Sequence, residues 1–329
     1  MTTVQSAKKY EELLGADVAA SPYEYATLFK AEGFFGRQRA KARFKLLKAI
    51  DVKLRHMLEP GEKVFYLTTG TTTTAGERFF VGWLSYYWNM RALVFTARRV
   101  LLLQIGVRQR PLELVSQLPY ASITSVKSTW NGMCAIKLLN RKTLNFQSVP
   151  KADRAFLIEF LADIVQLTNA PFEHKRGIEH LCPHCFTFVP EYPAACPKCD
   201  GLFKSARKAG LLSLLFPGVG GWYLGHRWTA LFEMIVTGVL WYLLVFAPLL
   251  GFGTPDQVPL GTEYWVTVGV VLLLTHLIDG ITTHHFARKG HYPLGVTALP
   301  ASLPPFVDRP KPDLNSLNKL KISRTNPPN

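Results

Sequence analysis

Two long apolar runs near the carboxyl end constrain this chain more than any other feature. Trp228 to Leu250 and Tyr264 to Phe286 have 23 residues each, and each contains one acidic residue and no Lys or Arg. At ~1.5 Å rise per residue, a helix of that length crosses a hydrocarbon core of roughly 30 Å. Central helices of a large soluble domain are the alternative, but such helices are seldom so long and so apolar. The two runs therefore predict a pair of membrane-spanning helices.

Basic residues flank this region on its outer sides. The flanking residues are Lys204, Arg207 and Lys208 before it and Arg288 and Lys289 after it. The segment between the two runs, 251–263, has no Lys or Arg. Because basic residues favour the cytoplasmic side, we expect a hairpin with both termini cytoplasmic, at the inner or plasma membrane if the protein is bacterial. The first 30 residues hold no continuous apolar stretch, so we expect no signal peptide.

A third apolar run, Ala209 to Leu224, is short and broken by proline and glycine, and we expect it to be re-entrant or interfacial. The stretch from Leu211 to Asp279 resembles the two-transmembrane domain family, in which glycines precede an aromatic pair and Leu-Gly, and an aspartate lies within a later apolar helix. The matching residues are Gly218, Gly221, Trp222, Tyr223, Leu224, Gly225 and Asp279. The chain departs from the family in its long apolar run and in His226 and Arg227, a pair that follows the aromatic residues instead of preceding them.

Three ionisable residues lie within or beside the apolar runs: Glu233, His276 and Asp279. Such residues are costly in a bilayer unless they are paired or face water. One explanation is pairing, for which the available partners are Arg227, His284 and His285. The other is a proton or ion path, which would need more than two helices and therefore a homo-oligomer.

The most specific motif is a pair of C-x-x-C sequences. Cys182-Pro-His-Cys185 and Cys196-Pro-Lys-Cys199 are separated by ten residues. Four thiolates at this spacing suit one tetrahedral Zn²⁺, and a site closed by four cysteines has no open position for substrate, so we expect a structural metal. Disulfides are the alternative, and a reducing cytosol argues against them. The loop between the pairs has no basic residue, which argues against nucleic acid as a partner.

Between Gly61 and Val165 the chain is typical of short β-strands followed by one helix. The expected strands are Lys63–Leu67, Arg78–Leu84, Ala92–Phe95, Val100–Ile105, Leu112–Leu118, Ile123–Lys127, Cys134–Leu139 and Thr143–Gln147, and the helix follows Pro150. Six aromatic residues between Phe79 and Trp88 are too many for one buried strand face. We expect either the bilayer interface or the N-terminal helix to cover them.

Two segments of this region carry a second resemblance. Leu93-Val-Phe-Thr-Ala-Arg-Arg-Val-Leu-Leu-Leu and Leu118-Pro-Tyr-Ala-Ser-Ile-Thr-Ser-Val look like the Thr-x-x-Arg strand turn and the following segment of bacterial pleckstrin-homology and GRAM-like domains. The resemblance implies a partly open β-barrel capped by a C-terminal helix, which binds lipid or protein and has no catalytic role. Arg98 and Arg99 either contact a phosphate or form hydrogen bonds that support the turn.

The chain has a formal charge of +15, and its densest basic block is Gly36 to His56, with eight Lys and Arg and one acidic residue. On a helical wheel the apolar residues of this block share one face, opposite Arg37, Lys41, Lys45, Lys48 and Arg55. Such a helix lies on an anionic membrane or packs on a neighbouring domain with its basic face in solvent, and both can hold at once.

Together these patterns predict a multidomain α+β membrane protein. The expected parts are an N-terminal helical region (1–58), a PH/GRAM-like domain (59–168), a zinc ribbon (178–204), a membrane region (205–290) and a disordered Pro-rich tail (291–329). No nucleophile, acid–base pair or phosphate loop occurs at a usable spacing. We therefore expect a non-enzymatic, membrane-anchored adaptor that binds anionic lipid or a protein partner. A subunit of a small oligomeric channel or transporter is the alternative.

Overall fold

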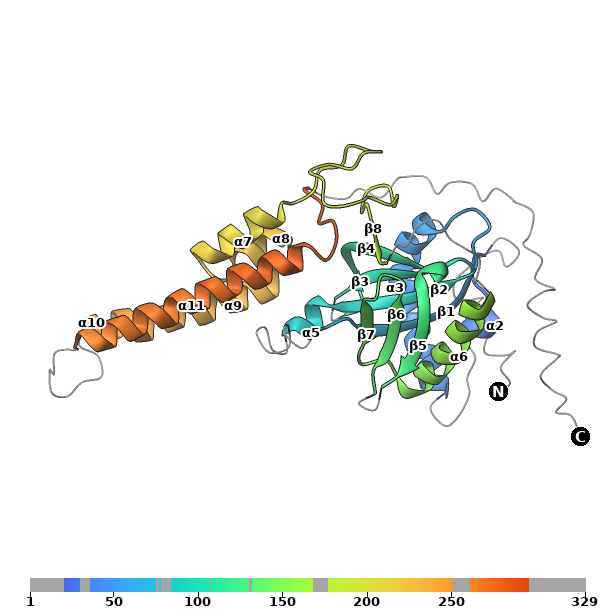
Figure 1. Cartoon of the computed structure of the whole chain (residues 1–329), viewed down its shortest axis with the longest axis horizontal. Coiled ribbons are helices and arrows are strands. Elements are labelled where there is room, and N and C mark those ends of the chain that lie inside the picture. The colour runs from blue at the N-terminus through green and yellow to red at the C-terminus, as the bar shows by residue number, and fades with distance from the viewer. Residues whose placement is uncertain are drawn as a thin grey trace, which may run out of the picture. The chain divides into compact units, whose positions relative to one another are not determined.

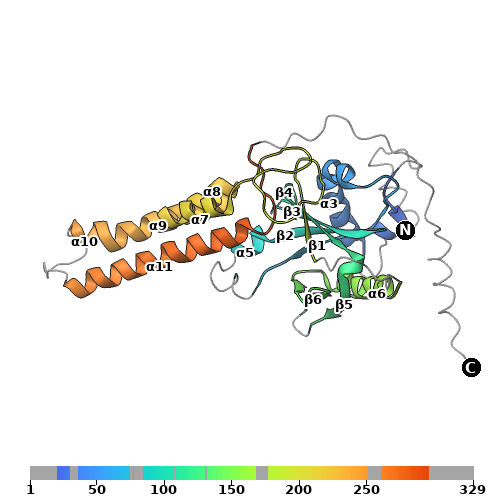
Figure 2. The same cartoon turned by 45° about the horizontal axis from the view of Figure 1, so that its top comes forward.

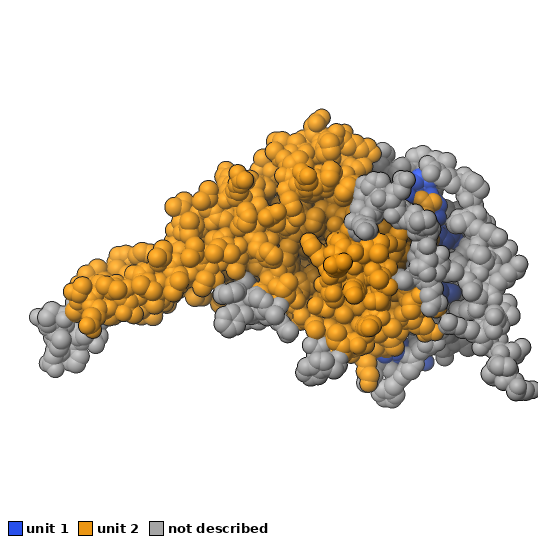
Figure 3. All heavy atoms as spheres, in the orientation of Figure 1, with its two compact units in different colours: residues 1–66, 300–329 blue, residues 67–299 orange. Residues whose placement is uncertain are grey.

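The computed structural model describes residues 21–29, 36–74, 77, 84–106, 108–129, 132–167, 177–250 and 261–295. The chain divides into two compact units, residues 1–66 with 300–329 and residues 67–299, which are coloured separately in Figure 3. Most of the predicted Pro-rich tail and residues 78–83 of the predicted second strand lie outside the described residues.

The first unit contains the predicted basic helix. Its elements are α2 (Tyr25–Leu28), α3 (Gly36–Met57) and the first residues of β1 (Val64–Thr71). The apolar side of α3 is buried at Leu46, Leu47, Ile50 and Leu54, which recur at helical spacing. Arg43 crosses to the other elements: it donates to the Leu28 carbonyl at 3.1 Å and to the Tyr66 hydroxyl. Apolar burial and these hydrogen bonds hold the unit together.

The second unit begins with two antiparallel sheets. The five-stranded sheet has the order β1-β2-β3-β4-β8, and the three-stranded sheet has the order β5-β6-β7. The strands after β1 are β2 (Met90–Thr96), β3 (Arg99–Ile105), β4 (Pro111–Pro119), β5 (Ile123–Ser128), β6 (Cys134–Leu138), β7 (Thr143–Phe146) and β8 (Glu179–Leu181), with the short 3-10 turn η2 (Tyr120–Ser122) before β5. Seven of the predicted strands are confirmed to within a few residues.

The predicted strand Arg78–Leu84 is the exception. Its last residue begins a short helix, α5 (Leu84–Trp88), and its other residues lie outside the described ones. The aromatic run is almost continuously apolar, so it lacks the alternation that separates a strand from a helix. Periodicity alone could not assign this segment.

One helix covers the three-stranded sheet. This helix, α6 (Lys151–Leu167), starts directly after Pro150, as the sequence predicts, and lies beside β5 in Figures 1 and 2. Its Leu157 and Leu161 are buried in the same apolar core as Phe95 of β2 and Phe146 of β7. Asp153 of α6 accepts a hydrogen bond of 2.6 Å from the buried Thr68 hydroxyl of β1, so both sheets contact this helix.

The remainder of the second unit is a set of helices near the carboxyl end. They are α7 (Ala206–Leu215), α8 (Val219–Leu224), α9 (Arg227–Trp241), the π-helical turn η3 (Tyr242–Phe246), α10 (Ala247–Leu249) and α11 (Thr262–Ala287). The α9 segment and α11 extend side by side in both views (Figures 1 and 2). Two helical segments, Arg227–Leu249 and Thr262–Ala287, are long and apolar enough to cross a membrane. Only 17% and 22% of their most apolar windows are buried, so this chain alone does not bury them as core helices.

The third apolar run forms two short helices with a break between them. Gly218 lies in the break with φ of +91°, and a Cβ there would lie 2.6 Å from the Ala230 carbonyl oxygen of α9. In α8, a Cβ on Gly220 would collide with the Ala209 carbonyl oxygen of α7. Both positions require glycine, one for its backbone conformation and one for the close approach of two helices.

Candidate functional site

The four cysteines lie in two loops of the same local geometry. In each loop the residue after the second cysteine has a positive φ: 56° at Phe186 and 55° at Asp200. Its backbone N–H donates to the carbonyl of the first cysteine, at 2.9 Å to Cys182 and 3.0 Å to Cys196. Each loop therefore turns tightly enough to direct both of its thiols to the same side.

The loops bring the thiols together as the C-x-x-C spacing predicts. All four Sγ atoms, those of Cys182, Cys185, Cys196 and Cys199, lie within 4.8 Å of one another. The closest pairs join different loops: Cys182 Sγ is 3.7 Å from Cys199 Sγ, and Cys185 Sγ is 3.7 Å from Cys196 Sγ. A disulfide bond is about 2 Å long, so these pairs are thiols and not disulfides. The group could hold a metal ion.

Backbone N–H groups point at the sulfur atoms. The His184 N–H contacts Cys182 Sγ, with the two heavy atoms 3.4 Å apart. Burial alone would raise the pKa of Cys196, but the N–H groups of Lys198 and Cys199 lower that pKa to about 7. Burial raises the pKa of Cys182 well above its usual value. The loops thus favour the thiolate at Cys196, whereas Cys182 needs a further positive charge to lose its proton.

The segment that carries the four cysteines, residues 179–204 (the cysteine segment), is joined at both ends to other parts of the second unit. Before the first cysteine, β8 pairs antiparallel with β4, with Leu181 opposite Val115. After the last cysteine, the Lys204 N–H donates to the Tyr292 carbonyl at 2.8 Å, and Phe203 forms a β-bridge with Pro293. The segment therefore connects the five-stranded sheet with the chain that leaves α11.

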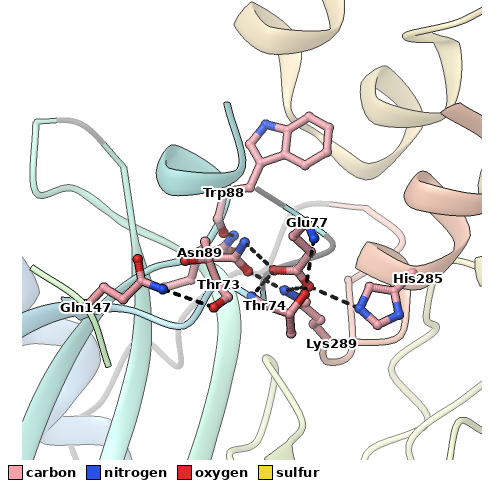
Figure 4. Close-up of polar contacts among 9 residues, drawn as sticks. Thr73, Thr74, Glu77, Trp88, Asn89, Gln147, His285 and Lys289 are labelled. Carbon is pink, nitrogen blue, oxygen red and sulfur yellow. Dashed lines mark hydrogen bonds and ion pairs between the residues drawn. The ribbon is translucent and has the colours of Figure 1, made fainter. Parts of the chain in front are cut away.

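A buried carboxylate forms a second connection between the sheet and the helices (Figure 4). Glu77 is 5% exposed, and its Oε1 lies 3.1 Å from His285 Nε2 and contacts Lys289 Nζ. Its Oε2 accepts from the Thr74 N–H at 3.1 Å and the Asn89 amide at 3.3 Å. Burial acts in the opposite direction, but the hydrogen bond from His285 and the charge of Lys289 hold the pKa of Glu77 below its usual value.

The sequence reasoning did not identify Glu77. One signal was available, because Glu77 is the single acidic residue between Glu62 and Glu113 and lies beside a strongly apolar run. An isolated acid in such a run needs a partner. The partner side chains come from the end of α11 and the residues after it, and no spacing rule connects positions so far apart.

Trp88, the last residue of the aromatic run, is covered by the base of the helical hairpin. Its ring stacks on His226 with centroids 5.2 Å apart and meets Phe286 edge-on at 4.7 Å. Its Nε1 donates to the Thr229 hydroxyl at 2.8 Å. Residues beside and within the apolar helices therefore cover Trp88. The expected covers of the aromatic run as a whole, the bilayer interface or the N-terminal helix, stay predictions.

The polar residues of the hairpin bond to other helices. Asp279 accepts a hydrogen bond of 3.0 Å from the Gly218 N–H. Both residues are among those that carry the resemblance to the two-transmembrane domain family. His276 Nε2 accepts from Trp241 Nε1 at 3.3 Å, so its Nδ1 carries the proton that it donates to the Leu214 carbonyl at 2.9 Å. Glu233 Oε2 is buried with no hydrogen-bond partner within the described residues. Pairing of Asp279 with Arg227, His284 or His285 was therefore the wrong expectation, and a backbone N–H takes that place.

The predicted lipid-binding residues differ in exposure. Arg37, Lys41, Lys45 and Lys48 are exposed along α3. Arg98 is exposed in the β2–β3 turn, whereas Arg99 is 9% exposed and donates to Gln117 Oε1. The Thr96 hydroxyl accepts from the N–H groups of both arginines, at 3.2 and 3.1 Å. Arg99 thus supports the turn, which was the structural alternative, and phosphate contact by Arg98 stays a prediction.

No protein-family model, curated protein or solved structure matches this chain.

Proposed function

We propose that this protein is a non-enzymatic, membrane-anchored binding protein that presents a zinc-stabilised soluble part to an anionic lipid surface. The observation that carries the proposal is the double connection between the soluble sheet and the base of the apolar hairpin. The cysteine segment makes one connection through β8 and Tyr292, and Glu77 makes the other through Lys289. Attachment to a membrane-spanning hairpin keeps the soluble part of the chain near the bilayer, which raises its effective concentration there.

Zinc is the metal that best suits the cysteine site. Four ligands at the usual zinc–sulfur distance of about 2.3 Å form a tetrahedron with edges of about 3.8 Å. The two closest sulfur pairs, at 3.7 Å, fit those edges. An all-thiolate donor set selects zinc over the hard cations Mg²⁺ and Ca²⁺. Because four cysteines complete the coordination, the metal would stabilise the fold and would offer no position for a substrate.

Membrane anchoring rests on the two apolar helices and their flanks. Large apolar side chains, such as Leu243, Leu273 and Ile281, are 57–65% exposed along them, a surface that water does not favour. Lys204, Arg207 and Lys208 precede the helices, and Arg288 and Lys289 follow them. By the positive-inside rule both termini then lie in the cytoplasm, together with the cysteine site.

Anionic lipid is the partner that best suits α3. Its exposed basic row runs from Arg37 through Lys41, Lys45 and Lys48, and each basic residue near an anionic surface contributes about 1 kcal/mol. The resemblance of the sheet region to pleckstrin-homology and GRAM-like domains is compatible with the same partner. A protein partner is the competing outcome of the test below.

The test uses the full chain reconstituted into vesicles, with an environment-sensitive dye attached through Val52→Cys. Val52 is 59% exposed and continues the basic row of α3. The dye should shift to an apolar signal when phosphatidylglycerol is added to phosphatidylcholine vesicles. Replacing Arg37, Lys41, Lys45 and Lys48 by Glu should abolish that shift. Replacing four other exposed basic residues, Lys127, Lys137, Arg141 and Lys142, by Glu provides the matched control. If both variants lose the shift equally, or if the unmodified chain shows none, a protein partner becomes the better proposal.

One observation favours transport as a second candidate function. Glu233 has a buried carboxylate oxygen with no hydrogen-bond partner within the described residues, and Asp279 interacts with it electrostatically. Two carboxyl groups in apolar surroundings are a common element of proton paths. If proton or cation flux through vesicles containing the protein is lost on Asp279→Asn, the transport function is supported, and if the vesicles show no flux at all it is excluded.

A further inference from the structure

A large cavity lies where three parts of the second unit meet. Its volume is about 630 Å³, which lies within the usual range of ligand sites, ~300–1,000 Å³. Thr73, Glu77 and Arg91 line it from the sheet region, His180 from the start of the cysteine segment, and Arg288 and Lys289 from the chain after α11. Figure 4 shows the polar side chains of Thr73, Glu77 and Lys289 gathered at this place.

Strand register directs Arg91 toward this cavity. Arg91 pairs with Gln104, and Leu93, two residues further along β2, pairs with Leu102 of β3. Leu102 pairs in turn with Ser116, and Ser116 with His180. Side chains of directly paired residues, and of residues two apart on a strand, share one face of a sheet. Arg91, Leu102, Ser116 and His180 therefore share a face, and all four line the cavity.

Arg91 is a buried arginine that lines the cavity. It is 6% exposed, and within the described residues no acceptor atom bonds to its guanidinium group. Burial lowers the pKa of Arg91 to about 10, although nearby Tyr292 and Glu77 act in the other direction. The group therefore still carries its charge at neutral pH. Buried charges are normally paired, because an unpaired one is costly to remove from water.

The other lining groups leave the cavity with a surplus of positive charge. Arg91, Arg288 and Lys289 are basic, and Glu77 is the single acid among the described lining residues. The Glu77 carboxylate is already bound by Lys289 and His285. Ser116, Asn145 and Gln147 add neutral polar groups that can donate hydrogen bonds. These positive charges and hydrogen-bond donors suit an acceptor-rich anion.

We propose that this cavity binds a phosphate-bearing ligand, with Arg91 as its bidentate donor and Arg288 at the side nearest the apolar helices. The planar guanidinium group matches two oxygens of a phosphate. Arg288 directly follows Ala287, the last residue of α11, so the cavity would lie at headgroup depth if α11 spans the bilayer. The choice of a phospholipid headgroup over a soluble phosphate ester rests on the proposed membrane anchoring, whereas the phosphate chemistry does not.

The experiment measures binding to the full chain in a neutral detergent by isothermal titration. The probes are short-chain phosphatidic acid, glycerol 3-phosphate and inorganic phosphate, with short-chain phosphatidylcholine as the zwitterionic control. Arg91→Gln should weaken binding by about tenfold or more, as expected for loss of a charge-assisted pair. Arg91→Lys should retain part of the affinity. Arg110→Gln, a change at an exposed arginine in the β3–β4 turn outside the cavity, is the matched control.

Thermal unfolding without ligand separates this role from a structural one. If Arg91 binds a ligand, the unliganded Arg91→Gln protein should be as stable as the unmodified protein or more stable, because an unpaired buried charge has been removed.

The two organic probes distinguish the sources of the phosphate. If phosphatidic acid binds more tightly than glycerol 3-phosphate, the ligand is a lipid, and if the order is reversed, the ligand is a soluble phosphate ester. The proposal is overturned if no probe binds, if Arg91→Gln binds equally well, or if that variant is destabilised with its affinity unchanged. The variant with Glu at the four α3 positions should still bind, so failure here is distinct from failure of the proposed function.

Discussion

The cysteine segment and a cluster formed by Glu77, Asn89, His285 and Lys289 (the Glu77 cluster) both attach the sheet to the hairpin. They are built in different ways. The four thiols come from one short segment, Cys182 to Cys199, and two repeated loops set their directions. The Glu77 cluster joins residues 208 and 200 positions apart, in the contacts of His285 with Glu77 and of Lys289 with Asn89. The first site is encoded by local spacing, and the second exists only after the sheet and hairpin have folded together. The two connections should therefore fail in different ways.

Loss of the metal should have the largest effect. The Cys182→Ser/Cys196→Ser variant should contain no zinc by elemental analysis, against one zinc per chain in the unmodified protein. Structural zinc contributes on the order of 10 kcal/mol of folding free energy in small zinc domains, so backbone amides from β8 to Phe203 should lose their protection from hydrogen exchange. Cys134→Ser is the control, because Cys134 lies in β6 and takes no part in the site. Zinc lost from the control, or retained in the double variant, would contradict the assignment.

Breaking the Glu77 cluster should have a smaller effect that leaves the metal in place. Glu77→Gln leaves Lys289 without its counter-charge, and removing one partner of a buried ion pair costs about 3–5 kcal/mol. We expect about 2–3 kcal/mol here, because 19% of the Lys289 side chain stays exposed. A double-mutant cycle with Lys289→Met checks this by denaturant unfolding. The double variant should lose less than the sum of the single losses, and strict additivity would show that the contact contributes nothing.

Packing between α7 and α8 supplies a third test. Gly220→Ala places a methyl group against the Ala209 carbonyl oxygen and should cost about 1–3 kcal/mol by overpacking. Gly269→Ala is the matched control, since nothing lies within 4 Å of a Cβ at Gly269. Unfolding in mixed detergent micelles should separate the two variants. Equal stability of both would mean that α7 and α8 do not approach as closely as described.

The smallest expected effect is a dependence on pH that belongs to the Glu77 cluster. The folded-state pKa of Glu77 lies below its usual value, so between those two values the unfolded chain binds more protons. The contribution of Glu77 is therefore complete above the ordinary glutamate pKa and is lost as pH falls through the folded pKa. Lys289, whose pKa burial lowers to about 8, adds stability as pH rises from about 8 toward its ordinary value of 10.5. Urea unfolding of Glu77→Gln across both ranges should show the acid loss reduced, and an unchanged acid profile would remove Glu77 as its source.

Local patterns were sufficient for much of the fold. Seven strands, α3, α6, both long apolar helices and the meeting of the four cysteines follow from alternation, helical periodicity and motif spacing. Each of these depends on residues close together in the sequence. The break between α7 and α8 was also readable, because Pro217 and Gly218 lie at it.

Long-range partners could not be read in the same way. No sequence rule assigns His285 to Glu77, His226 to Trp88 or the Gly218 N–H to Asp279. The helix α5 was missed because an apolar run without alternation suits a helix and a strand equally. The cavity that Arg91 lines was also missed, because its lining residues come from three parts of the second unit that lie far apart in the sequence.

Proteolysis of sealed inside-out membrane vesicles from cells expressing the full chain tests the central claim most directly. The account predicts that an added protease degrades the part before Ala206 while a hairpin fragment containing Arg227–Leu249 and Thr262–Ala287 stays with the membrane. Recovery of the intact chain in the soluble fraction, or protection of the cysteine segment until detergent is added, would contradict it.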